Sequence, residues 1–102
     1  MSEKKNIVLI GFMGCGKSKT SRELAARCAR RRYSTDKMIQ RKEGMTIPEI
    51  FRVKGEAYFR GVEKDVVAKV ALRKNAIIDC GGGVAVDPEN MAHLKKNGEI
   101  LT

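Results

Sequence analysis

The chain has 102 residues, of which 42% are hydrophobic and 32% are charged, and its formal net charge is +9. These values are typical of a folded globular protein, exclude a disordered chain, and leave room for one domain only. We therefore expect residues 1–102 to form one domain, whose positive charge favours anionic partners.

The N-terminus and the cysteines bear on location and redox chemistry. The first residues, MSEKK, lack the apolar core of a signal peptide, and the longest apolar runs are far shorter than a bilayer span. The sequence thus predicts a cytoplasmic protein without membrane contact.

The chain has three cysteines, Cys15, Cys28 and Cys80. Because their number is odd and they form no C-x-x-C pair, they indicate neither a disulfide framework nor a zinc site. We interpret each as a small filler residue.

Strand and helix patterns alternate in the first part of the chain. Residues 6–10 (NIVLI) form an apolar run, as expected of a strand buried on both faces of a parallel sheet. A helix over residues 17–31 should follow, and residues 33–35 allow a short strand or a loop. Asp36 is the predicted N-cap of a second helix, which ends at Gly44. The expected buried stripe of the first helix consists of Leu24, Ala25, Cys28 and Ala29.

Two further helices are predicted in the middle of the chain. Thr46 and Glu49 form a capping-box pattern for a short helix that ends at Gly55. A longer helix over residues 56–73 has apolar residues at helical spacing.

The last part of the chain returns to strands. Residues 76–78 predict a buried strand that leads to three consecutive glycines. Asp87 and Pro88 predict the start of a helix that ends near Gly98, and a last strand is expected over residues 99–102. The alternation of strands and helices predicts an α/β protein with a parallel sheet.

The segment GFMGCGKSKT lies between the first strand and the first helix and matches the P-loop pattern Gly-x4-Gly-Lys-Ser. Its glycines let backbone amides turn around a β-phosphate, and the helix N-terminus adds a positive pole. Lys17 is predicted to contact phosphate oxygens, and Ser18 to be a ligand of Mg²⁺. A tight turn without a ligand is the alternative. The predicted nucleotide-binding residues are Gly11, Gly14, Cys15, Gly16, Lys17, Ser18 and Lys19.

Four segments, GFMGCGKS, STDKMIQ, GMTIPEIFRVKGEAYFRGVE and IIDCGGGVAVDPEN, together resemble the N-terminal part of the shikimate kinase family. The third segment is the most specific, because adenylate and gluconate kinases share the loop but not this segment. The resemblance implies a P-loop sheet with strand order 2-3-1-4-5, which here would stop after the start of strand 4. It also implies ATP-dependent phosphoryl transfer to the 3-hydroxyl of shikimate, in aromatic amino-acid biosynthesis, with ATP and Mg²⁺ as cofactors.

The resemblance also implies roles for single residues. Asp36 matches the aspartate that hydrogen-bonds shikimate and accepts the proton of the 3-hydroxyl, so Lys17 and Asp36 are the expected catalytic residues. Arg60 matches the arginine that pairs with the substrate carboxylate, and Glu63 matches the acidic residue that holds this arginine. The other implied substrate-binding residues are Gly81, Gly82 and Gly83.

Most of these residues also have a purely structural interpretation. Asp36 alone suits a helix N-cap, and the Arg60–Glu63 pair alone suits a solvated ion pair on a helix. The three glycines alone suit a flexible turn. Phe51 and Phe59 match apolar walls under the substrate ring, but they are core residues by default. The family order and spacing of all these residues together favour the functional interpretation.

Three residues bear on metal and nucleotide binding. Ser34 stands where the family usually has an aspartate for the Mg²⁺ shell, which predicts weaker metal binding because a hydroxyl has no charge. Lys19 stands where threonine is usual. Asp79 ends an apolar strand like a Walker B acid and is a second magnesium candidate, although an acid there is not the family rule.

The length of the family leads to further expectations. Its members continue to a lid and an adenine loop that this chain lacks, so we expect weak activity or none. A non-catalytic nucleotide-binding fragment is the alternative function. The first strand should lie near a sheet edge, poorly covered, and favour self-association. The arginines Arg27, Arg30, Arg31 and Arg32 lack interleaved aromatic residues and do not favour a nucleic-acid surface.

Overall fold

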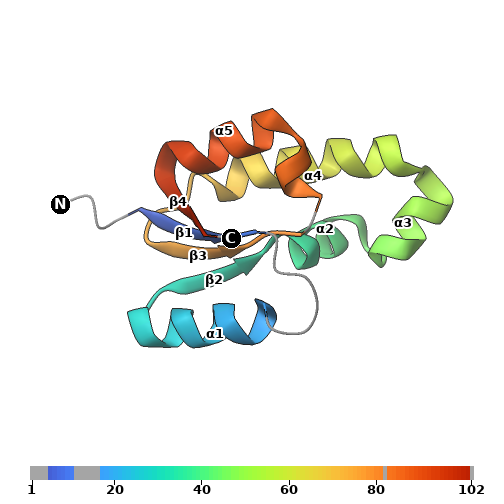
Figure 1. The fold of residues 1–102 in the computed structure, drawn as a ribbon. Coiled ribbons are helices and arrows are strands. Elements are labelled where there is room, and N and C mark those ends of the chain that lie inside the picture. The colour runs from blue at the N-terminus through green and yellow to red at the C-terminus, as the bar shows by residue number, and fades with distance from the viewer. Residues whose placement is uncertain (1–4, 11–16, 82, 102) are drawn as a thin grey trace.

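The computed structural model describes residues 5–10, 17–81 and 83–101, with the side chains of residues 17–21 and 101 left out. Four parallel strands form one sheet in the order β2-β3-β1-β4 (Figure 1). The strands are β1 (Asn6–Leu9), β2 (Arg31–Ser34), β3 (Ala76–Asp79) and β4 (Gly98–Leu101). This arrangement confirms the predicted α/β class and the implied order of the first four strands.

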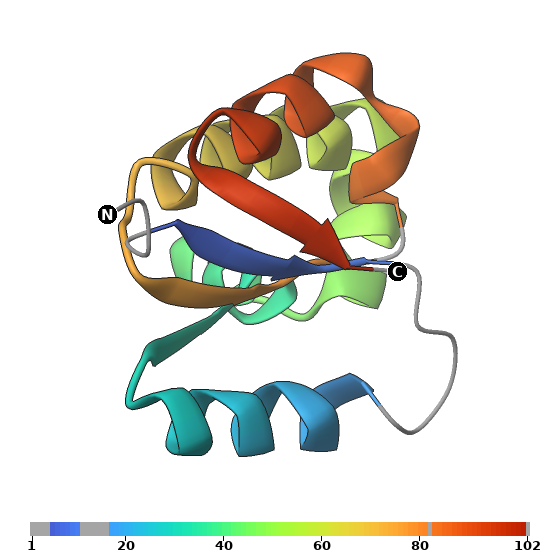
Figure 2. The ribbon, with the colours of Figure 1, turned by 60° about the vertical axis from the view of Figure 1, so that its left-hand side comes forward.

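The helices are α1 (Lys17–Cys28), α2 (Thr35–Glu43), α3 (Ile47–Lys54), α4 (Glu56–Val70) and α5 (Pro88–Asn97), with a 3-10 turn η1 at Val84–Val86. Helices α4 and α5 cover one face of the sheet and α1 lies on the other (Figure 2). None of the helices within the described residues combines the length and the apolar composition needed to cross a membrane.

The predicted poor coverage of the first strand needs correction. β1 pairs with β3 on one side, where Val8 lies opposite Ile78, and with β4 on the other, where Val8 lies opposite Ile100. Val8 and Leu9 are almost completely buried. The prediction of a poorly covered strand is therefore wrong, because the four residues of β4 pair along the whole of β1. Within the described sheet, β2 and β4 are the outer strands.

Two apolar clusters hold the layers together. The first lies between the sheet and helices α4 and α5, and it includes Cys80, which is fully buried as a small filler. The second joins α2, α3 and α4 through Ile39, Ile50 and Phe59. The second cluster fixes α2 and α4 relative to each other, and these two helices contain the predicted residues Asp36 and Arg60.

Helix α1 ends earlier than predicted, at Cys28. Ala29 adopts a left-handed conformation with φ 55°, and the N–H of Arg30 donates to the carbonyl of Ala25 at 2.9 Å. This pattern is a helix-ending turn that usually contains glycine, so the sequence offered no signal for it. Because the chain reverses here, β2 already begins at Arg31, two residues before the predicted strand.

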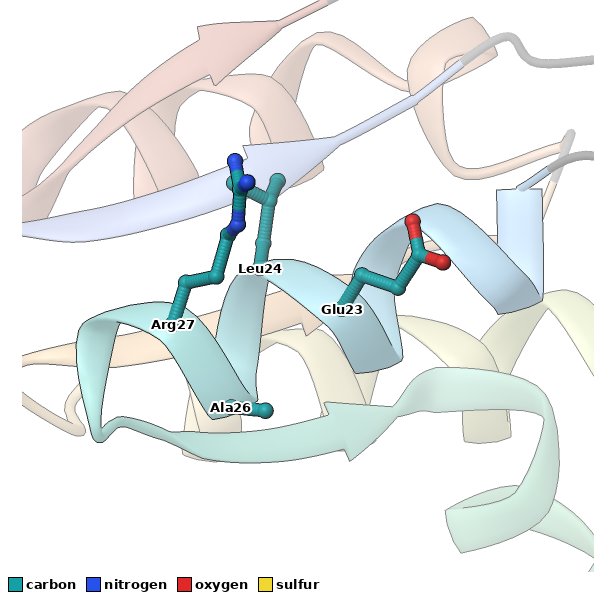
Figure 3. A pocket seen from close by; sticks show the side chains of 4 residues that line it. All are labelled: Glu23, Leu24, Ala26 and Arg27. Carbon is teal, nitrogen blue, oxygen red and sulfur yellow. The ribbon is translucent and has the colours of Figure 1, made fainter.

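The buried stripe predicted for α1 is correct only in its first half. Leu24 and Ala25 are half-buried, whereas Cys28 and Ala29 are exposed. The helix packs on β2 and β3. Beside it is a hollow of about 550 Å³ lined by Glu23, Leu24, Ala26 and Arg27, shown in Figure 3.

Several predicted helix ends are confirmed. In the capping box of α3, the N–H of Glu49 donates to Thr46 Oγ1 at 3.3 Å, and the N–H of Thr46 donates to Glu49 Oε1 at 2.8 Å. Asp87 caps α5 by accepting the N–H of Glu89 at 2.8 Å. Gly44 ends α2 with φ 70°. These ends depend on neighbouring residues only, which is why local sequence predicts them.

Helix α4 ends at Val70 instead of Arg73. The buried side chain of Asn6 holds the turn that follows: its Nδ2 donates to the carbonyl of Arg73 at 2.8 Å, and its Oδ1 accepts the N–H of Ala76 at 2.9 Å. These contacts join residues far apart in sequence, and helical spacing alone could not reveal them.

Candidate active site

The candidate site lies where β2 and β3 end. Ser34 lies opposite Asp79 in the last pair of these strands. Beyond this pair the chain enters α2 on one side. On the other side it reaches Gly81 and Gly83, whose described backbone we call the glycine turn. In open parallel α/β sheets, ligands bind at the carboxyl ends of the strands, so this is the expected place for a substrate.

Asp36 lies in the first turn of α2 but is not its N-cap. Ser34 is the N-cap, and its hydroxyl accepts the N–H of Lys37 at 3.3 Å. The prediction of Asp36 as N-cap is therefore wrong, because β2 leaves the sheet two residues earlier. The Asp36 carboxylate instead lies against Gly81: a Cβ added at Gly81 would be 3.1 Å from Asp36 Cγ and closer still to Oδ1.

Arg60 and Glu63 form an ion pair on α4 in which the carboxylate is buried. Arg60 Nη1 lies 3.1 Å from Glu63 Oε1, and the Glu63 side chain is 3% exposed against 42% for Arg60. Burial raises the pKa of Glu63, the Arg60 guanidinium opposes this shift, and the charges of Asp36 and Asp87 reinforce it. Arg60 also lies 3.6 Å from Glu56. In a solvated surface pair both side chains would be exposed. The burial of Glu63 therefore favours the functional interpretation of this pair over the purely structural one.

A cavity of about 340 Å³ adjoins this ion pair, lined by Arg60, Glu63, Gly83, Val86, Asp87 and Pro88. Gly83 is in close contact with the arginine, because an added Cβ would lie 2.9 Å from Arg60 Cζ. The Arg60 guanidinium and Gly83 thus lie side by side in the lining of this cavity.

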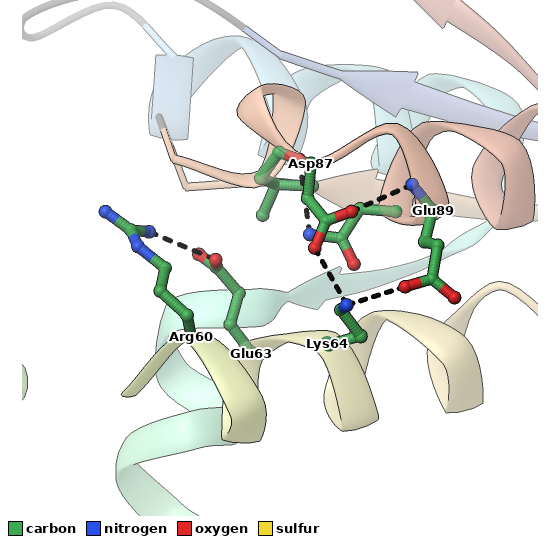
Figure 4. Close-up of polar contacts among 7 residues, drawn as sticks. Arg60, Glu63, Lys64, Asp87 and Glu89 are labelled. Atoms are coloured by element: carbon green, nitrogen blue, oxygen red, sulfur yellow. Dashed lines mark hydrogen bonds and ion pairs between the residues drawn. The ribbon is translucent and has the colours of Figure 1, made fainter. Parts of the chain in front are cut away.

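Lys64 links α4 to the start of α5 beside this cavity. Its Nζ lies 3.2 Å from Asp87 Oδ2 and 2.6 Å from Glu89 Oε1 (Figure 4). The N–H of Glu89 and the Lys64 ammonium lower the pKa of Asp87. No local sequence pattern indicates this link, because it depends on how α5 packs on α4.

The two phenylalanines differ in burial. Their ring centroids are 4.7 Å apart, and Phe59 is 4% exposed while Phe51 is 37% exposed. The Arg60 guanidinium lies 5.3 Å from the Phe59 ring, within the range of a cation–π contact. Phe59 therefore belongs to the core and supports Arg60, while Phe51 has an open face.

The nucleotide-binding predictions lie mostly outside the described residues, namely those for Gly11, Gly14, Cys15 and Gly16, as does Gly82 among the substrate glycines. Lys17, Ser18 and Lys19 form the first turn of α1, and their side chains are not described. Their predicted roles stay predictions.

The candidate magnesium ligands are likewise untested. Asp79 forms an ion pair with Arg32 at 3.0 Å, which partly neutralises its carboxylate, and the Ser34 hydroxyl is used as a helix cap. Among the described residues there is no group of three His, Cys, Asp or Glu side chains that could hold a metal ion. Ser18 and Asp79 both stay predicted ligands.

Comparison with known proteins decides the family. A family model described as shikimate kinase matches residues 13–101. The chain belongs to the shikimate kinase family. This confirms the resemblance noted in the four sequence segments. The shikimate kinase of Caldanaerobacter subterraneus subsp. tengcongensis is 44% identical over 97 residues, which are 95% of this chain and 57% of that protein.

Solved shikimate kinases have the same fold. The enzyme from Acinetobacter baumannii, solved in complex with shikimate, aligns with a TM-score of 0.90 and 38% identity over 95% of this chain and 54% of that chain. The enzyme from Aquifex aeolicus aligns with a TM-score of 0.86 and 38% identity over 93% and 56%. The chain thus spans a little more than half the length of these relatives.

Proposed function

We propose that the chain belongs to a kinase that transfers a phosphoryl group from ATP to the 3-hydroxyl of shikimate, and that the described residues form much of its shikimate site. The observation that supports this most is the Arg60–Glu63 pair, whose carboxylate is buried and whose arginine lies against Gly83 in the lining of a cavity. The solved relative in complex with shikimate supports the choice of substrate.

Arg60 would bind the substrate carboxylate. A guanidinium has donors in a planar fork that fits a carboxylate with two parallel hydrogen bonds. Glu63 accepts from Nη1, and Phe59 lies beside the guanidinium group, so both limit its rotation. The 42% exposed fraction of Arg60 leaves part of the fork accessible to a ligand.

Asp36 would bind and activate the acceptor hydroxyl. A carboxylate both orients an attacking hydroxyl and takes its proton, which suits phosphoryl transfer. Because Gly81 has no side chain, the Asp36 carboxylate lies directly against the backbone of the glycine turn. Substrate hydroxyls and backbone amides can then meet at one place.

Mg·ATP would supply the phosphoryl group, with Lys17, Ser18 and the loop glycines as the residues that hold it. Ser34 replaces the usual acidic residue near this position, and its oxygen already accepts the N–H of Lys37. We therefore expect a higher Mg²⁺ requirement than in relatives with an aspartate here, because a neutral oxygen attracts a divalent cation less strongly.

The proposal is tested by measuring ADP formation in the presence of shikimate, gluconate or a nucleoside monophosphate. We expect shikimate alone to stimulate ADP release. In Arg60→Lys, the shikimate KM should rise by about 10-fold or more, because lysine cannot form two parallel bonds. Arg41→Lys, on the exposed surface of α2, is the matched control and should behave like the original chain. Stimulation by gluconate or by a nucleotide, but not by shikimate, would overturn the proposal.

A second candidate is a nucleotide-binding protein without turnover, favoured by Ser34. In that case Mg·ADP would bind, Lys17→Ala would abolish binding, and no substrate would stimulate ADP release. Restoring the acid with Ser34→Asp separates the two functions, because it should increase the turnover of a kinase and leave a binding protein inactive.

A further inference from the structure

We propose that Thr35 is a positioning residue that sets the distance between Asp36 and the glycine turn. The inference rests on the proposed function, because it takes these two features as parts of the shikimate site. Thr35 is the first residue of α2 and is fully buried. Its Oγ1 accepts the N–H of Gly81 at 3.0 Å, a contact between residues 46 positions apart.

This hydrogen bond continues the pairing of β2 with β3 beyond the end of β2. Successive residues of a parallel strand direct their backbone groups to opposite neighbours, and the N–H of Cys80 donates to the carbonyl of Leu9 on β1 at 3.0 Å. The next N–H, that of Gly81, therefore points toward the β2 side. There the strand has ended at Ser34, opposite Asp79. A threonine hydroxyl takes the place of the missing strand carbonyl.

The hydrogen bond between Thr35 and Gly81 affects Asp36, because little space separates the Asp36 carboxylate from Gly81. Asp36 directly follows Thr35, and a Cβ on Gly81 would already collide with its carboxylate. Any displacement of α2 from the glycine turn therefore moves this carboxylate relative to the turn's backbone. Thr35 acts through Asp36 and Gly81 and has no direct role in the chemistry.

Two substitutions distinguish the effect of the Thr35 hydroxyl from the effect of the side-chain shape. Thr35→Val keeps the shape and removes the acceptor, which leaves a buried N–H unsatisfied, whereas Thr35→Ser keeps the acceptor. We expect Thr35→Val to raise the shikimate KM or Kd by about 10-fold, with the Mg·ATP KM changed by less than about 2-fold, and Thr35→Ser to stay within about 2-fold of the original chain. A general loss of structure would affect both substrates.

Hydrogen exchange of the Gly81 amide provides a readout that does not require activity. The amide should exchange slowly in the original chain and in Thr35→Ser, and faster in Thr35→Val. Thermal unfolding checks that each variant is folded, and Thr35→Ala replaces Thr35→Val if the latter does not fold.

The outcomes are distinct. Unchanged shikimate binding in the folded variant without the hydroxyl, or an equal loss in Thr35→Ser, would overturn the role of Thr35. If the original chain does not bind shikimate at all, the proposed function fails instead. In that case equal protection of the Gly81 amide with and without the hydroxyl would independently refute the positioning contact.

Discussion

Replacing Gly83 by alanine should weaken shikimate binding while leaving the chain folded. Gly83 has φ −80° and ψ −11°, a conformation that alanine adopts without strain. The added Cβ would, however, lie 2.9 Å from Arg60 Cζ and nearer still to Nη1. Atoms do not approach this closely, so the guanidinium must move away from its position 3.1 Å from Glu63.

The magnitudes separate the two effects. Loss of a hydrogen bond to a charged group lowers the free energy of unfolding by about 1.5–3 kcal/mol. Alanine in place of glycine raises it by roughly 0.4–1 kcal/mol, because alanine restricts the unfolded chain. The partial exposure of Arg60 reduces the loss further. We therefore expect the free energy of unfolding to fall by at most about 2 kcal/mol. A misplaced arginine should weaken shikimate binding by about 10- to 100-fold.

Calorimetric titration and urea unfolding measure the two quantities. Gly61→Ala is the matched control, because Gly61 lies inside α4 and an added Cβ there meets no atom within 4 Å. This variant should gain about 1 kcal/mol from helix propensity and bind shikimate normally. If folded Gly83→Ala binds shikimate as tightly as the original chain, the assignment of Arg60 to the substrate carboxylate is wrong.

Two other predictions concern stability and assembly. The folded pKa of Glu63 is raised above its ordinary value of 4.5, so the folded chain binds this proton more tightly than the unfolded chain. Its contribution to stability should therefore fall as pH rises from 4.5 through the raised pKa. Urea unfolding of Glu63→Gln over the same range should lack this slope, and parallel profiles would contradict the shift. The outer side of β4 should promote self-association at high concentration. Sedimentation that shows only monomer would refute it.

Much of the fold could be predicted because it depends on short-range patterns. The capping box at Thr46 and the Asp87 cap involve residues two or three positions apart, and both are confirmed. The end of α1 could not be predicted, because a left-handed Ala29 has no sequence signature. The sequence predicts Asp36 as the N-cap of α2, but the N-cap is Ser34, because the capping residue depends on where β2 leaves the sheet.

The residues of the candidate site could be predicted from the sequence, but their burial and their contacts could not. The family segments identified Asp36, Arg60 and Glu63, yet the burial of Glu63 depends on how α4 packs. The contacts of Thr35 with Gly81 and of Lys64 with Asp87 join segments far apart in sequence. Such contacts follow from tertiary structure, and no local pattern contains them.

The proposed shikimate site depends on Arg60. Titration of shikimate into the purified chain, with and without Mg·ADP, measures binding to this site without requiring turnover. We predict saturable binding at one site per chain, which Arg60→Lys weakens by about 10-fold or more and Arg41→Lys leaves unchanged. Absence of binding, or equal binding by both variants, would contradict the proposed site.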